Sequence, residues 1–234
     1  MSTPAHKPFL LASGSPRRSF LLKACGFQFS VKPTNVPEDF HQELPARFVP
    51  KYLAQIKAEA SRKDNPNTNL IITADTVVIL NNQILNKPAD ETEAVGMLER
   101  LSGRTHEVIT AVGISTPSGM DFIECNSKVT FRKLNKESVQ SYVREFKPLD
   151  KAGAYGAQEC LPEGYNPCSE EEIIFLNRIG QPRLLEESKP EYQTTLPMVA
   201  IERIEGSYFN VMGLPIHLLL DPLNKLLNGV NQRN

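Results

Sequence analysis

The sequence predicts an α/β fold in which strands and helices alternate along one domain. Apolar segments rich in β-branched residues alternate with segments whose apolar residues recur at helical spacing. At the start of the chain, the strand-like run 9–12 leads through a short polar turn into a helix-like run. Such alternation is typical of α/β architecture. With 234 residues, the chain is also long enough to bury a full core.

The first predicted helix begins with a proline. Pro16 fits the first helical position, because its fixed φ and missing N–H cost nothing there. Ser15 then becomes the N-cap, and Gly26 ends the helix. A strand is predicted over residues 27–33. In the next helix, apolar residues recur at helical spacing from Phe48 to Ala60.

The longest apolar run lies in the first half of the chain. Residues 70–80 predict a buried strand interrupted by a single charge, Asp75. Asn81-Asn82-Gln83 predicts a hairpin turn into a second, short strand. The next helix opens with the capping-box pattern of Asp90 and Glu93.

The remaining part of the chain contains a change of composition. Between residues 159 and 197 the sequence is acidic and punctuated by prolines, with a short helix capped by Ser169 and Glu172. We expect a single domain over residues 1–234 that carries an insertion at about 159–197. Before this segment, the sequence predicts a strand hairpin over residues 107–132 and a helix opened by an asparagine over residues 135–148. After it, the sequence predicts two segments joined by a turn over residues 199–212 and a final helix over residues 215–227.

Composition excludes several classes of function. The formal net charge is −1, and no basic patch indicates a nucleic-acid partner. No apolar run reaches the roughly 18 residues that a bilayer requires, and the N-terminus lacks the order of a signal peptide, so we expect a cytoplasmic protein without membrane contact. The 4 cysteines and 4 histidines show no zinc-ligand spacing and no disulfide framework.

The turn from Ser13 to Arg18 predicts an anion-binding site. It places Ser13, Ser15, Arg17 and Arg18 beside the positive end of a helix dipole. Hydroxyls, free amides and guanidinium groups together suit a multiply charged phosphate chain. The same residues also fit an ordinary capped helix with solvated arginines, and both interpretations remain open at this point.

Asp75 is the next candidate, because an ionised carboxylate inside an apolar strand costs several kcal/mol unless it is paired or binds a metal. The alternative is a strand end at which the side chain is exposed. Beside a phosphate site, a carboxylate can bind Mg²⁺ or orient an attacking water.

Other candidates gain weight only in combination. Lys57 and Lys87 would add cations for a triphosphate, although each lysine taken alone is typical of a solvated surface. Glu38 could be a second metal ligand or a loop acid. Gln158 ends a run of small residues and has the donor and acceptor needed to bind a base edge, or it is a surface amide. Neither GxxxxGK[ST] nor GxGxxG follows a strand, so a Walker-type or dinucleotide site is not supported.

A set of ordered motifs runs along the chain. The motifs are Ser13-Gly14-Ser15-Pro16-Arg17-Arg18, Ala74-Asp75-Thr76-Val77-Val78, Asn86-Lys87-Pro88, Leu101-Ser102-Gly103-Arg104-Thr105-His106, Asp150-Lys151-Ala152-Gly153-Ala154-Tyr155-Gly156, and Gly206-Ser207-Tyr208 with Gly213-Leu214-Pro215. In this order they resemble the Maf family of nucleoside triphosphate pyrophosphatases. The resemblance covers residues 9–158 and about 199–225.

The resemblance implies a fold, a reaction and a set of roles. It implies a Maf-like twisted mixed sheet flanked by helices, distantly similar to inosine triphosphate pyrophosphatases, with two lobes around a cleft. It also implies a homodimer that hydrolyses a nucleoside triphosphate to monophosphate and pyrophosphate with Mg²⁺ or Mn²⁺. Asp75 matches the family's catalytic acidic residue, which accepts a proton, and Glu38 matches an acidic site position that could bind the metal. The phosphate-binding positions are Arg17, Arg18, Lys57 and Lys87, together with Ser13 and Ser15 of the turn.

The resemblance also implies a preference for dTTP and UTP, because Arg17, Thr76 and Gln158 resemble the residues found in the family's pyrimidine branch. The long link after Gln158 departs from the family pattern and could alter the base pocket. The alternatives are a non-catalytic nucleotide-binding regulator of cell division, a pyrophosphatase for noncanonical purines such as ITP or XTP, and one for 7-methyl-GTP.

Overall fold

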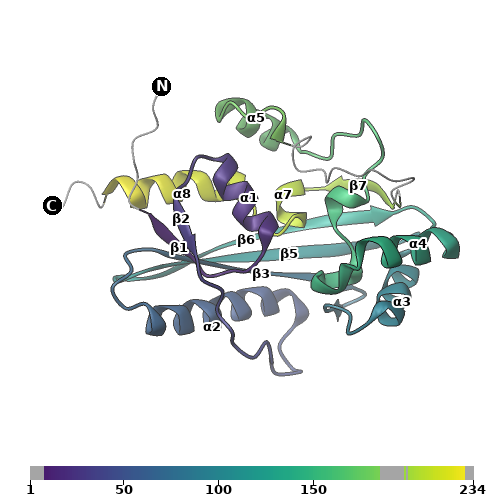
Figure 1. Cartoon of the computed structure of the whole chain (residues 1–234), viewed down its shortest axis with the longest axis horizontal. Coiled ribbons are helices and arrows are strands. Elements are labelled where there is room, and N and C mark those ends of the chain that lie inside the picture. The colour runs from purple at the N-terminus through teal and green to yellow at the C-terminus, as the bar shows by residue number, and fades with distance from the viewer. Residues whose placement is uncertain (1–7, 185–197, 199, 230–234) are drawn as a thin grey trace.

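A mixed β-sheet forms the centre of the protein (Figure 1). The structure is a computed structural model that describes residues 8–184, 198 and 200–229. Within these residues the sheet has seven strands in the order β2-β1-β3-β5-β6-β7, and β4 pairs with β3. The strands are β1 (Phe9–Leu11), β2 (Phe29–Val31), β3 (Ile71–Leu80), β4 (Gln83–Leu85), β5 (Thr105–Thr116), β6 (Gly119–Phe131) and β7 (Ile201–Glu205).

Strand direction makes the sheet mixed. β1 runs parallel to both β2 and β3, whereas every other pairing is antiparallel. The helices are α1 (Pro16–Ala24), α2 (Val49–Asp64), α3 (Glu91–Leu101), α4 (Lys136–Phe146), α5 (Glu170–Arg178), α7 (Tyr208–Val211) and α8 (Ile216–Gly229). Short 3₁₀ turns are η1 (Ala46–Phe48), η2 (Pro148–Asp150), η3 (Ala152–Ala154) and η4 (Ala157–Glu159). The predicted α/β fold with a mixed sheet is confirmed.

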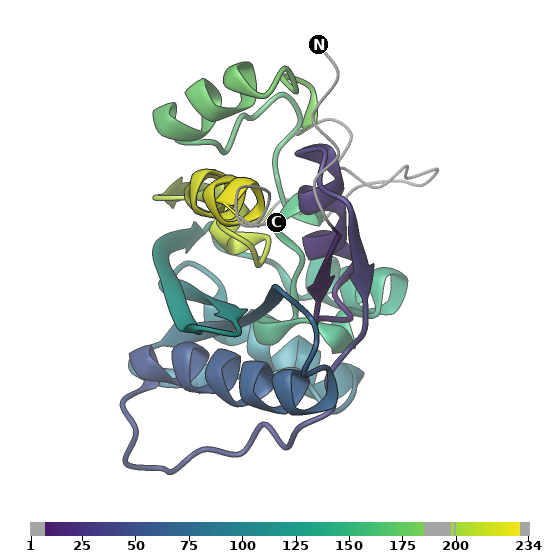
Figure 2. The same cartoon turned by 90° about the vertical axis from the view of Figure 1, so that its left-hand side faces the viewer.

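The helices cover both faces of the sheet. α2 lies on one face, while α1, α7 and α8 lie on the other, and α5 forms an outer layer above α8 (Figures 1 and 2). On the α2 side the core contains Val49, Leu53, Val77, Ile79 and Ile109. The larger core lies on the opposite side. The even-numbered β3 residues from 72 to 80, apart from position 76, belong to it, which follows from the period of two along a strand.

Most predicted helix starts are confirmed by their caps. Ser15 is the N-cap of α1 and Pro16 its first residue. The side chain of Asp90 accepts a hydrogen bond from the amide of Glu93 at 2.8 Å, and Asn135 caps α4 in the same way. Each such cap contributes about 1 kcal/mol. The predicted β3–β4 turn contains Asn81 and Asn82 at φ values of 51° and 62°, the left-handed region that a two-residue hairpin requires.

The segment predicted as an insertion is described only in part. Its helix α5 has the predicted capping box, because Ser169 Oγ accepts from the amide of Glu172 and the Glu172 carboxylate accepts from the amide of Ser169. Residues 185–197 of this segment lie outside the described residues. Beyond it, residues 201–205 are a strand, and the residues after the turn form the short helix α7.

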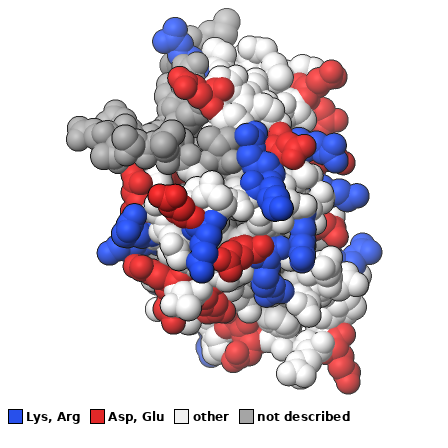
Figure 3. Space-filling view, turned by 90° about the vertical axis from the view of Figure 1, so that its right-hand side faces the viewer, with Lys and Arg blue, Asp and Glu red and all other residues white. Residues whose placement is uncertain are grey.

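Charges of both signs are mixed on the surface seen in Figure 3. On the face seen in Figure 3, Lys and Arg side chains lie next to Asp and Glu side chains instead of forming a patch of one sign. None of the helices in the described part of the chain is long and apolar enough to cross a membrane.

Candidate active site

The middle of β3 is open on one side. There β1 pairs with Ile71 and Ile72, and β4 pairs with residues 78–80, so residues 73–77 have no strand partner on that side among the described residues. The gap leads into a cleft of about 630 Å³. Both Asp75 and Thr76 line this cleft. Asp75 therefore lies at mid-strand, and the alternative of an exposed strand end does not hold.

Asp75 is paired with a lysine from α2. Its side chain points to the α2 face, where Lys57 Nζ lies 2.5 Å from Oδ1 of Asp75 and 2.7 Å from Oε1 of Glu38. Asp75 is only 8% exposed. Lys57 stands two helical turns into α2, so the packing of α2 on the sheet brings the two charges together. The result is a carboxylate–ammonium–carboxylate group at the wall of the cleft.

Burial and charge act in opposite directions on these carboxyl groups. Burial raises the pKa of Asp75 above its ordinary value, and the charges of Lys57 and Arg18 offset this only in part. Partial burial also acts to raise the pKa of Glu38, but Lys57, Lys87 and Arg18 outweigh it, so that pKa is lowered. Asp75 is therefore the carboxyl group of the two that is better suited to accept a proton.

Arg18 is fixed by three different elements. Its Nε donates to the carbonyl of Gly213 at 2.8 Å, one terminal nitrogen donates to Ser13 Oγ at 2.9 Å, and the other donates to Thr76 Oγ1 at 3.0 Å. Burial lowers the pKa of Arg18 to about 10, with Asp75 opposing the shift, so the guanidinium stays charged at neutral pH. A guanidinium held in one orientation loses little entropy when it binds a phosphate.

Arg17, the preceding residue of α1, also lines the cleft. Its nearest acid is Asp150, with 3.7 Å between Nη1 and Oδ2. Asp150 also accepts from Lys151 Nζ at 2.8 Å. Lys151 is 9% exposed and lies 3.8 Å from the buried carboxylate of Glu159. Asp150 and Lys151 both line the cleft, which adds a further cation to its wall.

The structure brings nearly all the predicted site residues into one cleft. Ser13, Ser15, Arg17, Arg18, Glu38, Lys57, Asp75, Thr76 and Lys87 all line it. Gln158 does not, although its neighbour Ala157 does. Oε1 of Gln158 is buried and has no hydrogen-bond partner among the described residues. A base-reading role for Gln158 stays a prediction.

Glu38 and Asp75 offer oxygen donors of the kind that a divalent cation prefers. Glu38 and Asp75 both approach Lys57, so hard oxygen donors converge at this wall of the cleft. Mg²⁺ commonly takes one or two carboxylates and completes its shell with water and phosphate oxygens. Within the described residues there is no group of three or more His, Cys, Asp or Glu side chains placed to hold a metal. The two carboxylates fit an ion that the protein and a triphosphate bind jointly.

Several site residues were not identified from the sequence. Asp150, Lys151, Tyr155 and Gly213 line the cleft, and they lie within motifs singled out above without a role. The signal was a lysine at the start of a run of small residues. His106 lies in the core beside Tyr155: it is 2% exposed, and its Nε2 lies 2.8 Å from the Tyr155 hydroxyl. Burial lowers the pKa of His106 to about 3, which keeps it neutral.

Comparison with known proteins finds relatives that share one name. The chain is 40% identical over 217 residues to a protein of Porphyromonas gingivalis named dTTP/UTP pyrophosphatase, which covers 92% of each chain. It is 37% identical to a protein of the same name from Phocaeicola vulgatus, over 93% of this chain and 95% of the relative. A third, from Cytophaga hutchinsonii, is 36% identical over 94% of this chain and 84% of the relative.

Solved structures are more distant. The Ham1 protein of Staphylococcus aureus matches at 15% identity with a TM-score of 0.41, over 53% of this chain and 72% of that chain. A likeness at this level carries no argument. The family model described as Maf-like protein matches residues 8–163, which include all the predicted site residues. Together with the full-length relatives, this match shows that the chain belongs to the Maf-like protein family.

Proposed function

We propose that the protein hydrolyses dTTP and UTP to the nucleoside monophosphate and pyrophosphate. The observation that carries the proposal is the position of Lys57 between Glu38 and Asp75, in the same cleft as Arg18. Cations for a triphosphate and a buried carboxylate for proton transfer are thus within one site. The relatives named dTTP/UTP pyrophosphatase, at up to 40% identity over 92% of the chain, support the substrate class.

The triphosphate is held by the cations and hydroxyls of the cleft. Arg18 keeps its orientation through Gly213, Ser13 and Thr76 and presents its guanidinium to the phosphates. The hydroxyl of Ser15 makes no capping hydrogen bond within α1, so it can donate to a phosphate oxygen. Each charge-assisted hydrogen bond contributes about 1.5–3 kcal/mol. The positive end of α1 adds to this field. Arg17, Lys57 and Lys87 line the same cleft and supply further positive charges for the phosphate chain.

Asp75 takes the proton of the attacking water. The water oxygen forms a bond to the α-phosphorus, the bond from that phosphorus to the bridging oxygen breaks, and pyrophosphate leaves with the bonding electrons. The proton released by the water goes to Asp75, whose pKa burial raises. Lys57 donates to Oδ1 of Asp75 and holds the carboxylate in place.

Glu38 and Asp75 would hold the divalent cation, Mg²⁺ or Mn²⁺. When bound, the ion would neutralise charge on the phosphate oxygens as it develops during the reaction. The chain's own contribution is to keep Glu38 ionised through Lys57, Lys87 and Arg18. Base choice belongs to the same proposal: Arg17 and Thr76 face the cleft, and Gln158 lies beside it.

The proposal extends to domain, assembly and compartment. It comprises a single domain with an insertion at about 159–197, which rests on the change of composition there, and a location in the cytoplasm, which is the expectation from the sequence. It also comprises a homodimer, which rests on the family resemblance. Light scattering after size-exclusion chromatography tests the dimer, and cell fractionation tests the compartment.

A pyrophosphate-release screen tests the reaction. Canonical, deaminated and methylated nucleoside triphosphates are offered with Mg²⁺, with Mn²⁺ and with EDTA, and we expect release from dTTP and UTP only when metal is present. Asp75→Asn should lose activity, whereas Asp121→Asn, an exposed acid on β6, should not. Binding without release would favour the regulator, and preference for ITP, XTP or 7-methyl-GTP would overturn the base assignment.

A further inference from the structure

Glu172 is a completely buried carboxylate far from the cleft along the chain. It lies on α5, has 0% exposure, and comes after residue 163, where the match to the family model ends. A buried carboxylate is costly unless hydrogen bonds satisfy it. Glu172 must therefore have hydrogen-bond partners that compensate for its burial.

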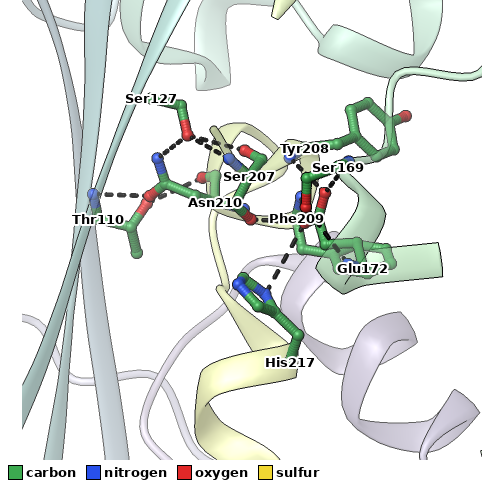
Figure 4. A network of polar contacts seen from close by, with 9 residues as sticks. All are labelled: Thr110, Ser127, Ser169, Glu172, Ser207, Tyr208, Phe209, Asn210 and His217. Carbon is green, nitrogen blue, oxygen red and sulfur yellow. Dashed lines mark hydrogen bonds and ion pairs between the residues drawn. The ribbon is translucent and has the colours of Figure 1, made fainter. Parts of the chain in front are cut away.

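Glu172 binds the start of α7. Its carboxylate accepts from the amide of Tyr208 at 3.0 Å, from the amide of Phe209 at 2.9 Å and from the Ser207 hydroxyl at 2.6 Å (Figure 4). Nδ1 of His217 lies 3.8 Å away. The free amides at a helix start are natural partners for a carboxylate. Glu172 thus joins α5 to the first turn of α7.

From α7 the contacts continue into the sheet. Oγ of Ser207 accepts from the amide of Asn210, and the Asn210 side-chain amide donates to the Val108 carbonyl on β5 at 2.8 Å. The Thr110 hydroxyl donates to the carbonyl of Asn210 at 3.0 Å. Figure 4 shows Asn210 between Thr110 and Ser127, pointing away from Glu172 toward the strands.

The same contacts end at the cleft. Since the Thr110 proton is used on Asn210, Thr110 Oγ1 accepts from the hydroxyl of Thr76, 2.9 Å away. Thr76 Oγ1 in turn accepts from Arg18. A second route runs directly through α7, because Gly213 follows it and its carbonyl accepts from Nε of Arg18 at 2.8 Å. Two of the three acceptors of Arg18 therefore depend on the placement of α7.

We propose that Glu172 is a positioning residue for the nucleotide site: it fixes α7 and thereby orients Arg18 toward the phosphates. This inference rests on the proposed function, because Arg18 is assigned to the triphosphate there. It gives helix α5 a part in substrate binding, although α5 does not line the cleft.

The test uses the full chain and measures two quantities. One is kcat/KM for pyrophosphate release from dTTP, and the other is Kd for a dTTP analogue with a non-hydrolysable α,β bridge. For Glu172→Gln, which keeps the size but loses the charge, we expect Kd and KM to rise about tenfold. Ser207→Ala, which removes one of the hydrogen bonds to Glu172, should show a smaller change in the same direction.

Matched variants on α5 separate positioning from folding. Glu171→Gln removes an exposed charge one residue away and should leave Kd unchanged. Leu176→Ala removes a buried apolar side chain that is 3% exposed, so it should lower the melting temperature without changing Kd below that temperature. Equal losses of binding in Leu176→Ala and Glu172→Gln at matched stability would overturn the proposal.

A double-mutant cycle with Arg18→Ala tests the route. If Glu172 acts through Arg18, Glu172→Gln should not weaken analogue binding further in the Arg18→Ala background. Additive losses would overturn the proposal. If the wild type binds the analogue but releases no pyrophosphate, the proposed reaction is wrong, but the double-mutant cycle still tests whether Glu172 acts on binding through Arg18. If the wild type does not bind the analogue, both proposals fall.

Discussion

The ammonium nitrogen of Lys57 lies 2.5 Å from Oδ1 of Asp75. The pair joins α2 to the middle of β3, at the gap in the sheet where the cleft begins. Glu38 shares the same ammonium at 2.7 Å. This geometry aligns a buried carboxylate beside an opposite charge and leaves it on the wall of the cleft.

Removing the lysine should disable the site. In Lys57→Met the apolar stem is retained, but Asp75 loses its partner, and we expect kcat/KM for dTTP to fall about 100-fold. Lys63→Met, an exposed lysine on the same helix, is the control. Pyrophosphate release measures both, and a Lys57→Met enzyme within twofold of wild type would contradict the role of the pair.

The pH dependence should report the raised pKa of Asp75. Because burial raises this pKa above its ordinary 3.8, the acidic limb of kcat/KM should lie at a higher pH than an exposed aspartate would give. Glu38 should not contribute there, since its pKa is lowered. A rate profile from pH 3 to 8 measures the limb, and a limb at or below the ordinary value would exclude Asp75 as the base.

The same shift has a consequence for stability. A carboxyl group whose pKa is higher in the folded protein takes up a proton on folding when the pH lies between its unfolded and folded pKa values. It therefore adds to the free energy of unfolding below the unfolded pKa, and this contribution is lost as pH rises through the folded pKa. We expect the stability of wild type relative to Asp75→Asn to decrease as pH rises. Urea unfolding at several pH values measures this trend, and the opposite trend would show that the pKa is lowered.

Thr76 should matter through its hydroxyl. It connects Arg18 to Thr110, so Thr76→Val should raise KM for dTTP about tenfold, the effect of one lost hydrogen bond to a charged group. Thr76→Ser retains the hydroxyl and should stay close to wild type. Steady-state kinetics on dTTP and UTP decide the matter, and equal KM values for the Val and Ser variants would argue against this contact.

Gly213 should tolerate no side chain. Its φ of +103° is a region that other residues rarely adopt, and a Cβ there would lie 3.4 Å from Thr76 Oγ1. Gly213→Ala should lose about 1–3 kcal/mol of stability and shift the carbonyl that orients Arg18. Gly96→Ala is the control: Gly96 lies within α3 with nothing near its Cβ position, so alanine should stabilise by about 0.5–1 kcal/mol. Urea unfolding compares the two.

Local patterns predicted most of the elements. The caps at Ser15, Asp90, Asn135 and Ser169, and the turn at Asn81-Asn82, involve residues that are neighbours in sequence, so short-range rules were sufficient. The continuous apolar run likewise predicted that residues 70–80 form a buried strand. No local pattern predicted that residues 208–211 form the short helix α7, because this helix is stabilised by Glu172, 36 positions away.

The site divides in the same way. The charged residues of the site could be predicted without coordinates, because an aspartate in an apolar strand, a phosphate-binding turn and ordered family motifs are visible in the chain. Three contacts could be seen only in the folded protein: Lys57 with Asp75, the Gly213 carbonyl with Arg18, and Glu172 with the start of α7. These contacts join residues distant in sequence, and their geometry depends on how helices pack on the sheet, which no local pattern encodes.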